Sequence, residues 1–302
     1  MTDWIGETFT SDVGWDHLET LVDTDTRMAG SDGERRAAEA TRDALEAVGA
    51  RNARLEGFDL QGWSRGSSVI RGGETTQDCI ALPRSPSGEA TGELVDLGYG
   101  LPSDFDGDLE GAVVLAASDV PDWQDRYVHR REKYYRAVEA GAAAFVYRNH
   151  VEGCLPPTGS VGTEGAPIGE IPAVGVSKEI GARLRRRFEG ERVTVDVEAD
   201  AHEATSQNVH ADLGPDTEAA VLLTSHVDAH DIAEGAADNQ TDNLHFYPTK
   251  PATRTPAPTP TNATTFSTPT VHTRGPPVHG ERRSTPPHRQ GEAFVYGVNG
   301  GG

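Results

Sequence analysis

Histidine and carboxylate side chains are concentrated in one short stretch, TSHVDAHDIAEGAADN, which spans residues 224–239. The apolar run EAAVLLTS (218–225) leads into it and predicts a strand that is buried on both faces. His226 and Asp228 form an H-x-D pair at the end of that strand, where open α/β sheets place their ligands. The imidazole could bind a metal ion while Asp228 accepts the other ring N–H and fixes the tautomer.

Asp238 is the second candidate metal ligand, because it follows a Gly-Ala-Ala loop and can fold back to the same point. A carboxylate there could bridge two divalent ions roughly 3.5–4 Å apart, an arrangement that promotes hydrolysis of a carbonyl compound. The alternative is a solvated acidic loop, since the chain has 48 acidic residues. For His230, Asp231 and Glu234 we favour that alternative.

Helical periodicity precedes this stretch near the N-terminus. Residues 12–23 are expected to form one amphipathic helix, and a second helix is expected to begin at Ser31 or Asp32 and to end at Val48, before Gly49. Two short strands are expected after the helices, at residues 53–60 and 67–70.

From residue 61 the pattern changes to that of a separate module of short strands with two helices. The expected strands are 93–98, 112–118, 143–148, 172–177 and 193–199, and the expected helices are 131–140 and 178–188. A further strand at 206–213 is joined to the strand at 218–225 by the turn Gly-Pro-Asp.

The composition breaks at Gln240. Residues 240–302 hold 10 of the 19 prolines, and six Lys/Arg against three acidic residues give this tail a net charge of +3. Proline at this density excludes helices and central strands, so we expect the tail to be disordered. The break suggests a change of reading frame near codon 240, and a natural Thr/Pro-rich extension is the alternative.

Bulk properties exclude several classes of protein. The formal net charge is −21, arginine far outnumbers lysine, and no basic stripe precedes the tail, which together indicate a protein of a salt-loving organism and argue against nucleic-acid binding. Cys79 and Cys154 lack the spacing of a disulfide framework or a cysteine zinc site. The N-terminus lacks an apolar leader and no run is long enough to span a membrane, so we expect a cytoplasmic protein without membrane contact.

The stretch VLLTSHVDAHDIAEGAADN resembles the first metal-binding segment of the M28 family of zinc peptidases, in which an apolar strand is followed by H-x-D, a glycine-rich loop and Asp-Asn. The resemblance implies that His226 binds zinc, that Asp228 supports it, and that Asp238, followed by Asn239, bridges two Zn²⁺ ions. Upstream, RMAGSDGERRAAEATRDALEAVGA (27–50) resembles the family's N-terminal turn and helix.

Residues from about 92 to 180, including GELVDLGYG, LEGAVVLAAS and AVEAGAAAFVYRNH, resemble the protease-associated (PA) domain that some members carry as an insert. The implied fold is α/β: an incomplete doubly wound aminopeptidase-like sheet, a β-rich α+β PA-like insert and a disordered C-terminal tail. The implied domains are residues 1–60 (N-terminal part of the peptidase-like domain), 61–201 (PA-like insert), 202–239 (first metal-binding segment) and 240–302 (tail).

The activity implied by the resemblance is a di-zinc aminopeptidase that removes N-terminal residues from peptides. Such enzymes also need a Glu-Glu pair, in which one glutamate is the general base, then an Asp and a second His. No Glu-Glu follows Asn239, so we expect the general base to be missing, metal binding to be weak and turnover to be small or absent in a truncated or frameshifted chain. The alternative is a non-catalytic protein that uses the PA-like domain for peptide or partner contacts.

Overall fold

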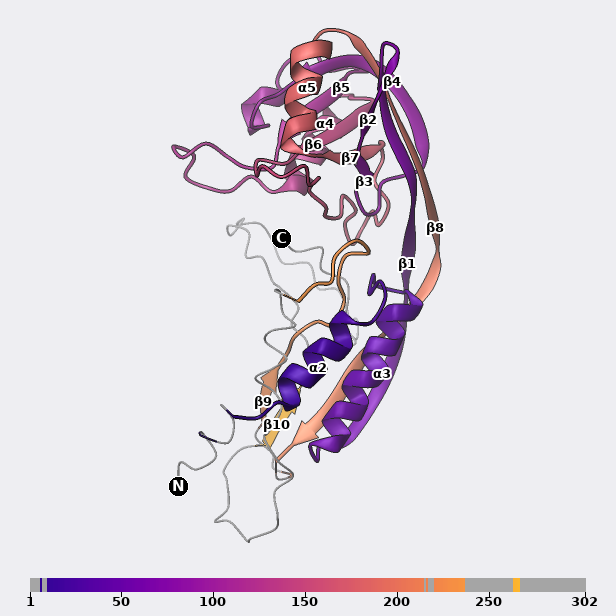
Figure 1. Ribbon diagram of the computed structural model, residues 1–302, viewed down its shortest axis with the longest axis vertical. Coiled ribbons are helices and arrows are strands. Elements are labelled where there is room, and N and C mark those ends of the chain that lie inside the picture. The colour runs from indigo at the N-terminus through magenta and orange to yellow at the C-terminus, as the bar shows by residue number, and fades with distance from the viewer. Residues whose placement is uncertain (1–5, 7–9, 215, 217–219, 237–262, 267–302) are drawn as a thin grey trace, which may run out of the picture. The chain divides into compact units, whose positions relative to one another are not determined.

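A computed structural model describes residue 6 and residues 10–214, 216, 220–236 and 263–266 of the chain, which divides into two compact units (Figure 1). Unit 1 is built on residues 1–60 and 204–298, and unit 2 on residues 61–203. The chain passes from unit 1 to unit 2 within strand β1 (Arg51–Gly72) and returns within strand β8 (Arg192–Leu213).

Unit 1 begins with the two helices expected from the sequence, α2 (Val13–Val22) and α3 (Asp32–Ala47). Ser31 is the N-cap of α3, because its Oγ accepts a hydrogen bond from the backbone N–H of Glu34 at 3.1 Å. Gly49 ends the helical segment with φ of +89°, a backbone conformation that glycine adopts without steric cost. Both predicted helices are therefore confirmed.

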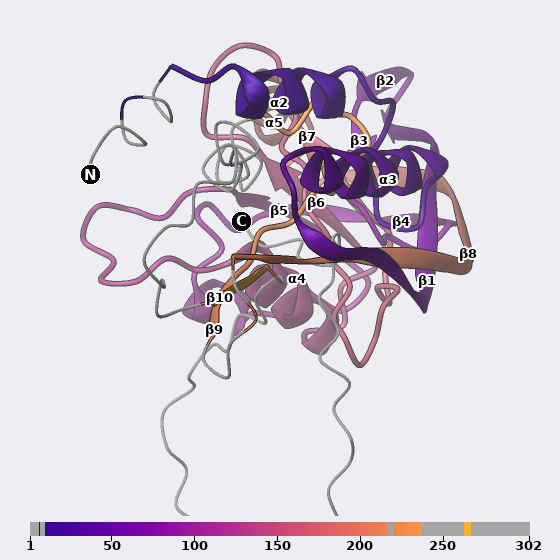
Figure 2. The ribbon, with the colours of Figure 1, turned by 90° about the horizontal axis from the view of Figure 1, so that it is seen from below.

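The two helices lie side by side and pack on β8, as Figures 1 and 2 show. Their apolar faces and the C-terminal half of β8 form one buried cluster, which consists of Leu21, Ala37, Ala38, Leu45, Val48, Val209, Ala211 and Val227. Val227 is the residue between His226 and Asp228. The core of unit 1 therefore anchors the candidate metal-binding loop.

Strand β9 (Ala220–Leu223) corresponds to the strand predicted at 218–225, but it is not buried on both faces, since Leu222 is 52% exposed. It pairs in parallel with β10 (Ala263–Phe266), which also pairs antiparallel with β8. Because β10 belongs to the tail, the prediction of a disordered tail is wrong for these four residues. The physical reason is local: residues 261–268 contain no proline, and Thr264, Thr265 and Phe266 favour a strand. The other residues of the tail lie outside the part of the chain that the structure describes.

Both long strands replace pairs of short strands in the prediction. The segments 53–60 and 67–70 are parts of β1, and 193–199 and 206–213 are parts of β8. Gly66 lies between the two predicted segments of β1, at a point where β1 and β8 approach each other closely. A Cβ at Gly66 would lie 2.6 Å from the carbonyl oxygen of Glu198 on β8.

Unit 2 contains a mixed sheet with the strand order β2-β1-β8-β4-β5-β6-β7-β3. The strands not yet introduced are β2 (Thr75–Asp78), β3 (Ile80–Ala81), β4 (Gly88–Asp96), β5 (Val113–Ala117), β6 (Ala144–Arg148) and β7 (Ala173–Val176). The pairs β4–β5, β5–β6 and β6–β7 are parallel. The pairs β4–β8, β1–β2 and β3–β7 are antiparallel. The predicted strands at 93–98, 112–118, 143–148 and 172–177 are confirmed.

Helices α4 (Arg130–Glu139) and α5 (Lys178–Phe188) lie on opposite faces of this sheet (Figure 2), and a short 3₁₀ helix, η1 (Pro102–Phe105), follows β4. Tyr134 and Ala137 of α4 pack on Phe145 and Tyr147 of β6. Both predicted helices are confirmed, and the chain is a mixed α/β protein, as predicted. Among the described residues, no helix has the length and apolar character needed to cross a membrane.

Candidate metal centre

His226 and Asp228 lie in the loop that follows β9, and the structure brings them into contact. Nδ1 of His226 is 2.6 Å from Oδ1 of Asp228 and 3.2 Å from its carbonyl oxygen. Asp228 is buried, and His226 is partly buried. The H-x-D spacing thus forms a paired imidazole and carboxylate at the carboxyl end of a strand.

This pairing has a chemical consequence for the ring. When Nδ1 carries the proton and donates it to the carbonyl oxygen of Asp228, the neutral imidazole has its lone pair on Nε2, which is one of the two ring nitrogens that bind metal ions. A zinc-binding histidine commonly has a carboxylate partner of this kind, so His226 fits one ligand position of a zinc centre.

Asp238 and Asn239 lie outside the described residues. Within the described ranges, no group of three or more His, Cys, Asp or Glu side chains is arranged to hold a metal ion. His230, Asp231 and Glu234 lie in a loop with a turn in which the Ala233 N–H donates to the carbonyl oxygen of His230 at 3.0 Å.

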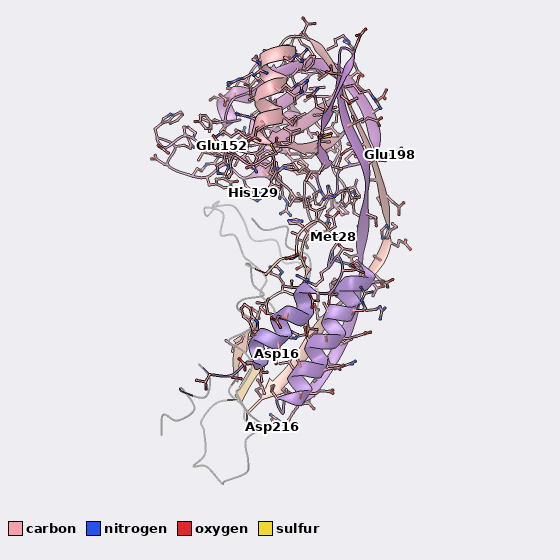
Figure 3. The ribbon with its side chains drawn as sticks, viewed as in Figure 1. Asp16, Met28, His129, Glu152, Glu198 and Asp216 are labelled. Atoms are coloured by element: carbon pink, nitrogen blue, oxygen red, sulfur yellow. The ribbon has the colours of Figure 1, made fainter. Side chains whose placement is uncertain are left out.

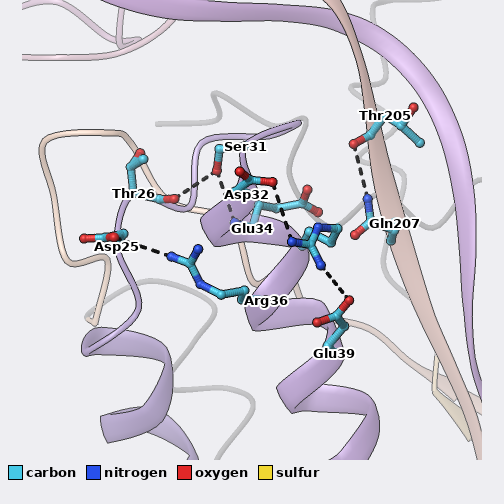
Figure 4. Close-up of polar contacts among 10 residues, drawn as sticks. Asp25, Thr26, Ser31, Asp32, Glu34, Arg36, Glu39, Thr205 and Gln207 are labelled. Atoms are coloured by element: carbon cyan, nitrogen blue, oxygen red, sulfur yellow. Dashed lines mark hydrogen bonds and ion pairs between the residues drawn. The ribbon is translucent and has the colours of Figure 1, made fainter.

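The turn between α2 and α3 lies beside this loop, and Met28, labelled in Figure 3, belongs to it. Ser31 organises the turn: its hydroxyl donates to the carbonyl oxygen of Thr26 at 2.9 Å while it caps α3 (Figure 4). Figure 4 also shows Arg36 reaching Asp25 at 3.5 Å across the same turn. The Ala229 N–H donates to the carbonyl oxygen of Arg27 at 3.1 Å, which joins the turn to the loop of His226.

Two buried ionisable residues surround Asp228, and sequence reasoning missed both. Burial lowers the pKa of Arg27, and the nearby Asp228 carboxylate partly offsets that effect. Burial raises the pKa of Glu34 to about 7; hydrogen bonds from Ser206, Gly30 and Gln207 oppose the rise, and the charge of Asp228 adds to it. Arg27 and Glu34 are two of the five charged residues in RMAGSDGERR, and no local pattern separates the buried ones from the exposed ones.

Comparisons with known proteins identify one domain of the chain and solved structures that have a similar fold. Residues 90–184 match the family model of the PA domain, which confirms the predicted PA-like insert. No curated protein sequence matches the chain. Several solved structures resemble the chain, among them two aminopeptidases and a peptidase M28 precursor.

An aminopeptidase from Aneurinibacillus sp. strain AM-1 is 26% identical with a TM-score of 0.57, over 78% of this chain and 57% of its own. BSAP, a zinc aminopeptidase from Bacillus subtilis, is 22% identical with a TM-score of 0.63, over 84% of this chain and 59% of its own. A peptidase M28 precursor from Shewanella amazonensis SB2B is 20% identical with a TM-score of 0.67, over 87% and 65%. The chain therefore spans less than two thirds of the length of each.

These findings establish one domain and a shared fold. The chain carries a PA domain, and its fold is that of the aminopeptidase structures it resembles.

Proposed function

We propose that this chain carries the first metal-binding segment of a zinc aminopeptidase that hydrolyses the N-terminal peptide bond of peptides. His226 and Asp238 are the proposed metal ligands, and Asp228 orients the imidazole. The observation that carries the proposal is the 2.6 Å contact between His226 and Asp228 at the end of a strand, in a fold shared with zinc aminopeptidases. Zinc, when bound in such a centre, polarises the substrate carbonyl and lowers the pKa of a water molecule.

The proposed ligands are too few for a complete catalytic zinc site, which limits the activity that we expect of this chain. A catalytic zinc ion takes three protein ligands, and a general base must accept the proton of the water. The 302 residues contain no Glu-Glu pair, which supplies the general base in the family that the chain resembles. We therefore propose weak zinc binding and little or no turnover for this chain.

Metal analysis of the wild-type chain and two variants tests this proposal. The measurements are zinc content after equilibrium dialysis, by mass spectrometry, and hydrolysis of an aminoacyl chromogenic substrate, both in high salt. We expect zinc to be lost in His226→Ala and retained in His230→Ala, a matched control in the same loop. Equal zinc in the wild type and His226→Ala would contradict the metal site, and rapid hydrolysis that His226→Ala leaves unchanged would contradict its role.

A second candidate function, binding of a peptide or partner by the PA domain, is favoured by a separate observation. Eight large hydrophobic side chains are exposed among the described residues, and five of them belong to loops that follow the carboxyl ends of β4, β5 and β6: Tyr99, Trp123, Tyr127, Val151 and Leu155. His129 and Glu152, labelled in Figure 3, come from the same loops. The carboxyl ends of parallel strands lie at one edge of a sheet and often bind ligands.

Hydrogen bonds tie these loops together. The hydroxyl of Tyr127 donates to the carbonyl oxygen of Ser118 at 3.2 Å, and the backbone N–H of His150 donates to the Ser118 hydroxyl at 3.0 Å. The loop after β5 also carries Asp119, Asp122 and Asp125, so a partner with apolar and cationic side chains would complement it.

Titration with peptides that combine aromatic and basic residues, followed by tryptophan fluorescence, tests this second function. Trp123→Ala should abolish binding, and Trp15→Ala, an exposed tryptophan of unit 1, should leave it unchanged. Equal loss in both variants would count against a binding surface in the PA domain.

A further inference from the structure

Arg27 is the most deeply buried arginine among the described residues, with 1% of its surface exposed, and all three nitrogen groups of its guanidinium donate hydrogen bonds. Nε donates to the carbonyl oxygen of Val227 at 3.0 Å. The two terminal nitrogens donate to the carbonyl oxygens of Leu21 and Glu234. One side chain therefore joins the end of α2 to two points of the candidate metal-binding loop.

The positions of these two points matter. Val227 is the residue between His226 and Asp228, and Glu234 precedes Asp238 by four residues in the sequence. The guanidinium thus contacts the loop at two points, next to His226 and again at Glu234. Its planar fork of donors has a fixed geometry, which a flexible lysine ammonium does not reproduce.

The backbone of Arg27 adds a fourth link, since its carbonyl oxygen accepts the Ala229 N–H. Asp228 lies close enough for its charge to stabilise the buried cation. Loss of the guanidinium would remove one donor from each of three carbonyl groups in and beside the loop, which is costly for buried groups.

We infer that Arg27 is a positioning residue for the metal-binding segment: its guanidinium sets the conformation of residues 226–234 and thereby the His226–Asp228 pairing. The link to metal affinity rests on the proposed function. The conformational part does not, so it can be measured separately.

The test compares Arg27→Lys and Arg27→Gln with two controls in the full chain. Arg36→Lys makes the same change at an exposed arginine of α3, and Val48→Ala weakens the core cluster that also contains Val227 but keeps the hydrogen bonds that Arg27 makes to the loop. The readouts are zinc affinity by competition with a chromophoric chelator, amide hydrogen exchange of residues 226–236, and the tautomer of His226 by ¹⁵N NMR.

We expect both Arg27 variants to weaken zinc binding by about 10- to 100-fold, the range for residues that orient a metal ligand. They should also accelerate exchange in residues 226–236 and return the His226 ring to the tautomer mixture of a solvated imidazole. Arg36→Lys and Val48→Ala should leave all three readouts near wild type. If the Arg27 variants leave the loop's exchange and the tautomer unchanged, or if Val48→Ala alters them equally, the inference is overturned.

Failure of the proposed function gives a different result. In that case wild type and His226→Ala bind zinc equally or not at all, while exchange and tautomer still report on Arg27. An effect of Arg27→Lys on those two readouts would then support the conformational role alone, and no effect would reject it.

Discussion

The hydroxyl of Ser206 on β8 donates a hydrogen bond to Oε1 of Glu34 on α3 at 2.8 Å, and both side chains are fully buried. A second bond comes from the Gly30 N–H at 3.4 Å. The first turn of α3 is thus joined to a strand more than 170 residues away by a carboxyl group rather than by apolar packing alone. Because the charge of Asp228 adds to the rise in the pKa of Glu34, Glu34 is electrostatically coupled to the candidate metal centre.

Glu34 should make unit 1 less stable as pH rises. Its pKa is raised from 4.5 to about 7 by burial, so between these values the folded chain binds a proton that the unfolded chain has lost. The contribution of Glu34 to the free energy of unfolding should fall by about 3 kcal/mol across that window and level off above it. Glu34→Gln should remove this contribution and leave the opposite one of His17, so the variant should gain stability as pH rises from about 4.5 to 6.5. Urea denaturation at a series of pH values in high salt measures this change.

Ser206→Ala provides the matched test of that explanation. Removal of a donor to the carboxylate should raise the pKa of Glu34 further and shift the decline to higher pH. An unchanged pH profile in Glu34→Gln would show that another group controls it.

His17 should act in the opposite sense. Burial lowers its pKa from 6.5 to about 4, so between these values the unfolded chain binds the extra proton and stability rises with pH. The gain should be about 3 kcal/mol. His17 lies on α2, where Nε2 is 3.3 Å from the hydroxyl of Thr41 on α3.

His17→Gln keeps a polar group near Thr41 but does not titrate. The stability of this variant should therefore fall as pH rises, over a range in which the stability of the wild type is nearly constant. Because the effects of His17 and Glu34 nearly cancel between about pH 4.5 and 6.5, the single variants should diverge in opposite directions. Parallel profiles for the two variants would refute the assignment.

Asp228→Asn should weaken zinc binding without unfolding the chain. The amide keeps the shape of the carboxylate but removes the charge that favours a proton on Nδ1 of His226. We expect a loss of about 10- to 100-fold in zinc affinity, measured by chelator competition. Asp231→Asn, in the same loop, is the control, and equal losses in the two variants would indicate a general effect of loop charge.

Gly66→Ala should destabilise unit 2 by about 1–3 kcal/mol, because the new methyl group would meet the carbonyl oxygen of Glu198 at 2.6 Å. Gly107→Ala is the matched change, since nothing lies within 4 Å of the position of its Cβ. Chemical denaturation should separate the two variants. Equal stability would mean that β1 and β8 can move apart at this point without cost.

Much of unit 2 could be predicted from sequence. Helix α5 begins at Ser177, whose hydroxyl accepts from the Ile180 N–H at 3.1 Å, and its predicted range of 178–188 equals the observed one. The short apolar runs at residues 112–118 and 143–148 predicted strands, and β5 and β6 lie there. These features depend on neighbours within a few residues.

The sequence by itself determined the helix boundaries, the PA-like insert and the H-x-D pair, since capping, periodicity and a two-residue spacing are local properties. Only the tertiary structure decided that β1 and β8 run unbroken, that four tail residues pair beside β8 and β9, and that Arg27 and Glu34 are buried near Asp228. Burial and strand pairing are set by segments up to 207 residues apart in this chain, as the bond from Arg27 to Glu234 illustrates. The sequence does not show whether a charged side chain is exposed to solvent or donates to a buried carbonyl group, because that depends on the packing of distant segments.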